Sequence, residues 1–188
     1  MEDTPTDSVS ARILVYMGLR DRFDKIFLEY YPKLIVFCMH SAGCGRHDAE
    51  DLAQDILSKA YEKSWRYDER YALSTWLYRI GRNKCIDWRR KTCRRRIESA
   101  YPAEGLPADA AHPEECLIRS ETADTVSRFM ESLAPDDRMI AYLRFYEDMP
   151  YAELARVLKK PEGTLKYRVN AIRRHLRTFM EEWYGIRR

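Results

Sequence analysis

Apolar residues in the first half of the chain recur at every third or fourth position, which is the spacing of one face of an α-helix. Pro32 interrupts the first of these runs, so we expect a boundary or kink near Tyr31. Gly43 and Gly45 predict a break, after which Asp48 is suited to cap a second helix. A polar loop over residues 67–74 leads into a third helix. The runs comprise Phe23, Ile26, Phe27, Tyr30, Leu34 and Phe37, then Leu52, Ile56, Leu57, Ala60 and Tyr61, then Trp76, Leu77, Ile80, Ile86 and Trp88.

The second half predicts four more helical segments: one over residues 117–133, one after a stop and cap at 134–137 that carries Met139, Ile140 and Leu143, and two over residues 151–158 and 162–179. Pro102, Gly105, Pro107 and Pro113 stand between the halves in a stretch without periodicity, which indicates a linker. We therefore expect an all-α fold of two small helical domains joined by a flexible linker. The expected units are a tail (1–20), a first domain (21–96), an acidic linker (97–113) and a second domain (114–188).

The net charge is only +3, so the distribution of charge along the chain is more informative than its sum. Residues 82–96 hold eight cations against the single acid Asp87. The charged residues of 98–124 are acidic apart from Arg119, and residues 166–177 are basic again. Two basic blocks separated by an acidic stretch suggest two contacts with a polyanion. Charge alone leaves open a second interpretation, in which both blocks are ordinary solvated helix faces.

Residues 151–179 have the spacing of a helix-turn-helix: a short helix, a brief turn and a longer basic helix. Leu165, Val169, Ile172 and Leu176 form one apolar stripe on the longer helix. The side chains off that stripe are suited to bases and phosphates: Lys166, Arg168, Asn170, Arg173 and Arg174. The alternative is a basic amphipathic helix on a three-helix bundle.

The first basic block interleaves cations with Trp76, Tyr78 and Trp88, and the loop before it adds Trp65, Tyr67 and Tyr71. Single-stranded nucleic acid is bound by such mixtures, since cations follow the backbone and rings stack on bases. Large aromatics at helical spacing are also common core residues, and we expect that role for at least one of the two tryptophans.

Three segments together resemble the extracytoplasmic-function (ECF) group of bacterial RNA polymerase sigma factors. Residues 48–55 (DAEDLAQD) resemble the polymerase-binding part of region 2, and residues 74–83 with 87–90 resemble its strand-opening, −10-reading part. Residues 133–135, 151–155 and 162–166 resemble region 4, which reads the −35 element. The resemblance covers residues 23–176, and the short linker leaves no room for a middle domain.

The resemblance implies an alternative sigma factor that binds core RNA polymerase, through the β′ clamp and β flap, and directs initiation at particular promoters. It also implies an anti-sigma factor as a partner. The polymerase-binding residues would be Asp48, Glu50, Asp51, Gln54 and Asp55. The −10 DNA would meet Tyr67, Tyr71, Ser74, Trp76, Arg82, Asn83, Lys84, Asp87, Arg90 and Arg94. The −35 DNA would meet Glu162, Gly163, Thr164, Lys166, Tyr167, Arg168, Asn170, Arg173 and Arg174.

Three positions depart from the family pattern near the DNA-reading helix. Lys159 stands where Gly often ends the helix before the turn, so that either it carries the steric cost of a left-handed residue or the turn differs. Tyr167 replaces a usually small residue, and Ala171 stands where Arg is frequent. We expect a −35 preference unlike that of well-known members.

No catalytic set is visible, so we expect neither an enzyme nor a cofactor. Cys38, His40, Cys44 and His47 lie within ten residues, but their spacing is not a standard zinc pattern, and we regard them as a weak metal candidate only. No apolar run is long enough to span a bilayer, and we expect a cytoplasmic protein without membrane insertion. The rival functions are a stand-alone helix-turn-helix regulator and a sigma mimic that binds an anti-sigma factor.

Overall fold

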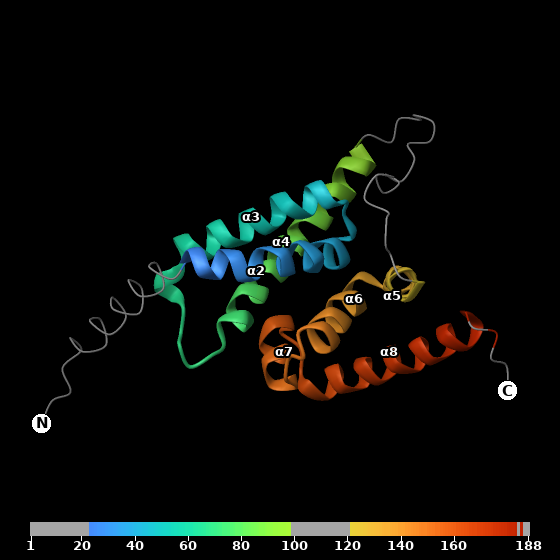
Figure 1. The fold of residues 1–188 in the computed structure, drawn as a ribbon. Helices are drawn as coiled ribbons and strands as arrows, with labels where there is room; N and C mark the ends of the chain where they lie inside the picture. Colours follow the sequence, from blue (N-terminus) through green and yellow to red (C-terminus); the bar gives the residue numbers. More distant parts are fainter. Residues whose placement is uncertain (1–22, 99–120, 184, 186–188) are drawn as a thin grey trace, which may run out of the picture.

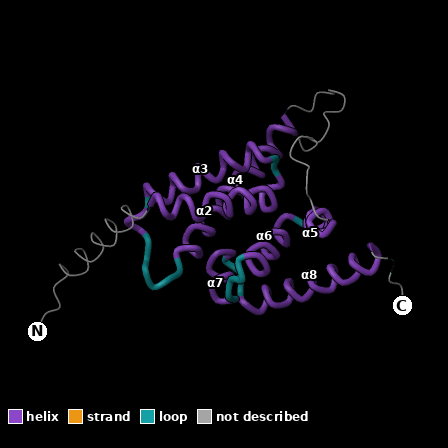
Figure 2. The backbone as a smooth tube through the Cα atoms, viewed as in Figure 1, coloured by secondary structure: helices purple, strands orange, loops and turns teal. Residues whose placement is uncertain are grey.

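The computed structural model describes residues 23–98, 121–183 and 185, and every regular element in that part of the chain is helical (Figures 1 and 2). The predicted all-α fold is confirmed. The linker predicted at 97–113 and the tail at 1–20 lie almost wholly outside the described residues. None of the described helices is long and apolar enough to cross a membrane.

The first domain packs α2 (Phe23–Cys38) against α3 (Arg46–Glu62) and α4 (Leu73–Glu98). A π-helical turn η1 (Met39–Gly43) links the first pair of helices, and a short 3₁₀ turn η2 (Ser64–Arg66) follows α3. Leu34, Phe37, Ile56, Leu57 and Leu77 are fully buried at the centre of the domain. Most of the apolar residues read from the sequence therefore form one core, whereas Phe27 and Tyr61 of the predicted stripes are exposed.

Two expectations in this domain need correction: of the boundary or kink expected near Tyr31 the boundary is absent, and Asp48 does not cap α3. Helix α2 continues through Pro32 to Cys38, because its buried face, which includes Leu34 and Phe37, outweighs the hydrogen bond that proline cannot donate. Helix α3 begins at Arg46 after Gly45, so Asp48 lies in the first turn instead of capping it. There its carboxylate still complements the positive end of the helix dipole.

The second domain consists of α5 (Glu121–Ser132), α6 (Pro135–Ala141), α7 (Tyr151–Leu158) and α8 (Glu162–Trp183). A π-helical turn η4 (Tyr142–Tyr146) extends α6. Leu143, Leu154, Val157, Leu165 and Val169 are fully buried where α6, α7 and α8 meet. The bounds of α7 agree with the predicted short helix, and α8 runs four residues further than predicted.

Lys159 ends α7 in the left-handed conformation, with φ 54° and ψ 44°. The conformation that glycine would adopt at this turn is therefore retained, and the lysine carries its steric cost. That cost is about 1–2 kcal/mol for a residue with a Cβ. A glycine would avoid it but would lower stability by about 0.4–1 kcal/mol, because the unfolded chain gains conformational entropy.

We therefore expect Lys159→Gly to raise the free energy of unfolding by about 0.5–1 kcal/mol in urea denaturation. Ala152→Gly is the matched control, because Ala152 is exposed within the same helix. It is expected to lower stability by about 1 kcal/mol. A loss of stability in both variants would contradict the strain at Lys159.

The two domains pack against each other, with α4 touching α7 and η1 touching α6 (Figure 1). Tyr142 of η4 is 2% exposed and enters the first domain, where its ring lies 5.6 Å from that of Phe37 and 6.2 Å from that of Tyr78. Its hydroxyl donates to the backbone oxygen of Lys33 at 2.9 Å. This buried contact decides how the polar faces of the two domains are placed.

Candidate functional site

The acidic face predicted to bind polymerase lies on the outside of α3. Asp48, Asp51, Gln54 and Asp55 are exposed, and Glu50 is half-buried. The opposite face of the helix is buried in the core, which is why these five side chains point away from it. Lys84 of α4 pairs with Asp55 at 2.8 Å, and Arg46 pairs with Glu50 at 3.0 Å. The face is suited to a basic partner surface.

The loop before α4 brings two predicted −10 residues together. The Tyr67 hydroxyl donates to the backbone oxygen of Tyr71 at 2.8 Å, and the Tyr67 ring lies 5.4 Å from the ring of Trp76. Trp76 is only 6% exposed, so in this arrangement it supports the loop and cannot itself stack on a base. Ser74 lies in the first turn of α4 and not in the loop, since the helix begins at Leu73.

A stripe of polar side chains follows the solvent face of α4. Asn83, Asp87, Arg90 and Arg94 are all exposed and are spaced by three and four residues, which places them on one side of the helix. Arg82 donates from Nη1 to Oδ1 of Asn83 at 3.1 Å and so orients the amide. A row of this kind can follow a nucleic-acid strand along the helix.

The outer face of α8 presents most of the predicted −35 residues to solvent. The exposed members are Glu162, Gly163, Thr164, Lys166, Tyr167, Asn170, Arg173 and Arg174. Lys166 Nζ lies 3.9 Å from Glu162 Oε2, and the Arg173 guanidinium lies 5.6 Å from the centre of the Phe145 ring. These contacts are exposed and weak, so both cations can turn to a phosphate.

Arg168 is the predicted −35 residue that the structure places differently. Its side chain is 26% exposed and pairs with Asp137 at 2.9 Å and with Asp136 at 3.9 Å, both at the start of α6. The apolar face of α8 is buried beside α6, and this packing turns Arg168 inward.

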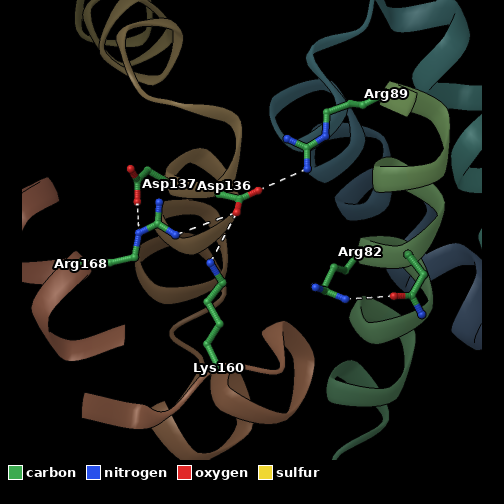
Figure 3. Close-up of polar contacts among 7 residues, drawn as sticks. Arg82, Arg89, Asp136, Asp137, Lys160 and Arg168 are labelled. Carbon is green, nitrogen blue, oxygen red and sulfur yellow. Dashed lines mark hydrogen bonds and ion pairs between the residues drawn. The ribbon is translucent and has the colours of Figure 1, made fainter. Parts of the chain in front are cut away.

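Asp136 gathers three cations at the boundary between the domains (Figure 3). Its carboxylate lies 3.3 Å from Arg89 of α4, 3.5 Å from Lys160 and 3.9 Å from Arg168. Burial alone would raise the pKa of Asp136, but the hydrogen bond from Arg89 and the charge of Lys160 outweigh it and lower the pKa. The sequence pattern indicates only that Asp136 stands at the start of a helix.

Two further contacts place α7 against residues that are predicted to meet −10 DNA or lie beside them. The Arg156 guanidinium lies 4.3 Å from the centre of the Tyr71 ring. The hydroxyl of Thr75 donates to the carboxylate of Glu153. No local pattern could have indicated these pairs, because their members are distant in sequence.

The weak metal candidate is not assembled. Cys38 is buried with its Sγ 3.8 Å from that of Cys85, while His47 is exposed and lies 3.7 Å from Asp51. Burial raises the pKa of Cys44 to about 12 and lowers the pKa of His40. Within the described ranges, no three His, Cys, Asp or Glu side chains form a group that could hold a metal ion.

Comparison with known proteins shows which family the chain belongs to. Residues 26–96 match the model of Sigma-70 region 2, and residues 123–176 match that of Sigma-70 region 4. The ECF RNA polymerase sigma factor SigW of Bacillus subtilis is 32% identical over 171 residues, covering 87% of this chain and 91% of that protein. The chain belongs to the ECF RNA polymerase sigma factor family.

A second relative agrees, and two solved structures share the fold. The ECF RNA polymerase sigma-E factor of Escherichia coli is 30% identical over 179 residues, covering 90% of this chain and 91% of its own. The sigma factor RpoE of Bartonella quintana, solved in complex with the anti-sigma factor NepR, has a TM-score of 0.70 at 27% identity, covering 85% of this chain and 96% of its own. CnrH, solved with the cytosolic domain of CnrY, shares the fold at 19% identity and a TM-score of 0.61, covering 91% and 95%.

Proposed function

We propose that this sigma factor binds core RNA polymerase through the acidic face of α3 and directs initiation at promoters that it reads with two separate surfaces. Helix α8 reads the −35 element as duplex DNA, and α4 with its preceding loop reads the −10 element as a separated strand. The observation that carries the proposal is the exposed stripe of Asn83, Asp87, Arg90 and Arg94 on the domain that matches region 2.

The chemistry of the stripe supports strand separation without catalysis. Cations of α4 hold the backbone of the non-template strand, while Asn83 and the Tyr67–Tyr71 loop hold a base that has left the stack. Flipping a base costs a few kcal/mol, which contacts in the pocket offset. The sigma factor family acts in transcription initiation and is non-enzymatic, so the energy for melting comes from binding. The protein works in the cytoplasm, where it meets polymerase.

An anti-sigma factor is the further partner that we propose. Two solved structures with this fold, the RpoE–NepR and CnrH–CnrY complexes, contain a second protein bound to the sigma-like chain, and NepR is an anti-sigma factor. The exposed acidic face of α3 would be a surface that polymerase and this regulator compete for.

In vitro transcription with purified bacterial core polymerase tests the proposed function. A pool of genomic promoter fragments is transcribed with and without the protein, and transcripts that start only in its presence are mapped. Specific starts with a shared −35 and −10 element support the proposal. Core binding without any start would indicate a sigma mimic, and absence of core binding would indicate a stand-alone regulator.

We expect Lys166→Ala and Arg173→Ala each to weaken binding to −35 duplex DNA. In each variant the negative slope of log affinity against log salt concentration should become shallower by about one unit, because each cation neutralises one phosphate. Titrations of labelled duplex at several NaCl concentrations measure this slope. Lys25→Ala is a matched control, since Lys25 is exposed on α2, away from α8. A slope unchanged in the α8 variants would show that neither residue touches phosphate.

A further inference from the structure

A row of four exposed residues, here called the central row, runs along the middle of the outer face of α8. Its members follow one another by three or four residues and therefore lie on one side of the helix: Gly163, Tyr167, Asn170 and Arg174. The buried stripe on the opposite side comprises Leu165, Val169 and Ile172. A recognition helix contacts base edges with its N-terminal residues. Under the proposed function, the first half of the central row therefore faces the bases of the −35 element.

The cations next to Tyr167 in the sequence are both held away from the central row. On one side, the Lys166 Nζ lies 5.6 Å from the centre of the Tyr151 ring, which belongs to α7. On the other side, Arg168 is directed inward and pairs with Asp137 at 2.9 Å (Figure 3). Tyr167 is thereby the large side chain that faces outward between them.

The ring of Tyr167 is chemically suited to one group in the major groove. Its side chain is 69% exposed, so the fold does not use the ring for packing. The major groove presents the C5-methyl group of thymine as an apolar contact for a side chain, whereas the other features that distinguish the bases are hydrogen-bond donors and acceptors. Asn170, the next member of the row, is suited to the N6 and N7 atoms of adenine.

The spacing of these two side chains matches the spacing of base pairs. Tyr167 and Asn170 are three residues apart, which is about 4.5 Å along the helix axis. Successive bases of a strand are separated by about 3.4 Å along the duplex. When α8 lies in the groove, the two side chains therefore meet neighbouring base pairs.

We infer that Tyr167 is a specificity-determining residue whose ring packs against the C5-methyl group of one thymine in the −35 element. This thymine belongs to the base pair next to the one whose adenine Asn170 contacts. The inference rests on the proposed function and deepens it, because it names two neighbouring A·T pairs as the step that the centre of α8 reads.

Replacement of single thymines by deoxyuridine, which removes only the methyl group, tests the inference. The probes are promoter fragments whose −35 and −10 elements have been mapped by transcription, and the holoenzyme is assembled from core polymerase and the full chain. We expect one thymine of the −35 element at which the replacement weakens binding about two- to fourfold, as expected for one buried methyl group. Tyr167→Phe should retain this effect because the ring remains, and Tyr167→Ser should bind thymine and deoxyuridine equally.

Tyr146→Ser is the matched control, because Tyr146 is 73% exposed but lies on η4 and outside the central row. It should respond to deoxyuridine as the wild-type protein does. In Asn170→Ala the response to deoxyuridine should also persist, while the preference for adenine at the neighbouring base pair should fall about fivefold or more.

Two outcomes would overturn the inference: no thymine of the −35 element at which deoxyuridine weakens binding of the wild-type holoenzyme, or an effect of the same size in Tyr167→Ser. Failure of the proposed function is distinguishable from both. In that case the wild-type holoenzyme would give no specific start on any fragment, whether the fragment carries thymine or deoxyuridine.

Discussion

Replacing Tyr142 with alanine is expected to separate the two domains in solution. The ring is 2% exposed between Phe37 and Tyr78, so its removal leaves a cavity at the centre of the domain interface. Truncation of a buried aromatic side chain costs about 3–5 kcal/mol, and here much of that cost falls on the contact between domains. The substitution also leaves the backbone oxygen of Lys33 without the donor that the hydroxyl supplies.

Urea denaturation followed by tryptophan fluorescence and circular dichroism measures the effect. We expect the transition of the wild-type protein to split in Tyr142→Ala into two transitions, one for each domain. Tyr146→Ala is the matched control: Tyr146 stacks on Tyr142 with ring centres 5.3 Å apart but is 73% exposed. Its removal should cost less than about 1 kcal/mol. Equal effects of the two substitutions would show that Tyr142 does not hold the domains together.

Asn83→Ala is expected to lower open-complex formation about tenfold or more while leaving core binding unchanged. A base-reading contact of an amide side chain contributes about 1–3 kcal/mol of discrimination, which is a factor of about 5 to 150. Asn83 is exposed on α4 and is not one of the acidic residues of α3 that we propose bind polymerase, so on that assignment the substitution removes a strand contact and not a polymerase contact.

Permanganate reactivity of unpaired thymines at a mapped promoter measures opening, and a separate binding titration measures affinity for core polymerase. Cys93→Ala is the control, because Cys93 is exposed on the same helix but off the stripe. Equal losses of opening and of core binding in Asn83→Ala would contradict the assignment of Asn83 to strand reading.

The helices and the helix-turn-helix could be predicted from the sequence because their signals are local. Apolar residues repeat with the period of a helix, and the segment between Leu158 and Glu162 carries turn residues. The exposed faces of α3, α4 and α8 follow from the same periodicity, since the side opposite an apolar stripe faces solvent. The ends of helices are harder to predict where tertiary packing outweighs a residue that disfavours helix, as at Pro32.

Only the tertiary structure decided which polar side chains are available. It buried Trp76, turned Arg168 towards α6, and placed Arg89 beside Asp136, 47 residues further along the chain. It also inserted Tyr142 beside Lys33, which is 109 residues away. Such pairs leave no periodic trace, because each depends on how two separately folded domains dock. The sequence by itself determined two helical domains and predicted polar faces on them for polymerase and DNA, and the docking of those domains determined which polar side chains pair across the interface.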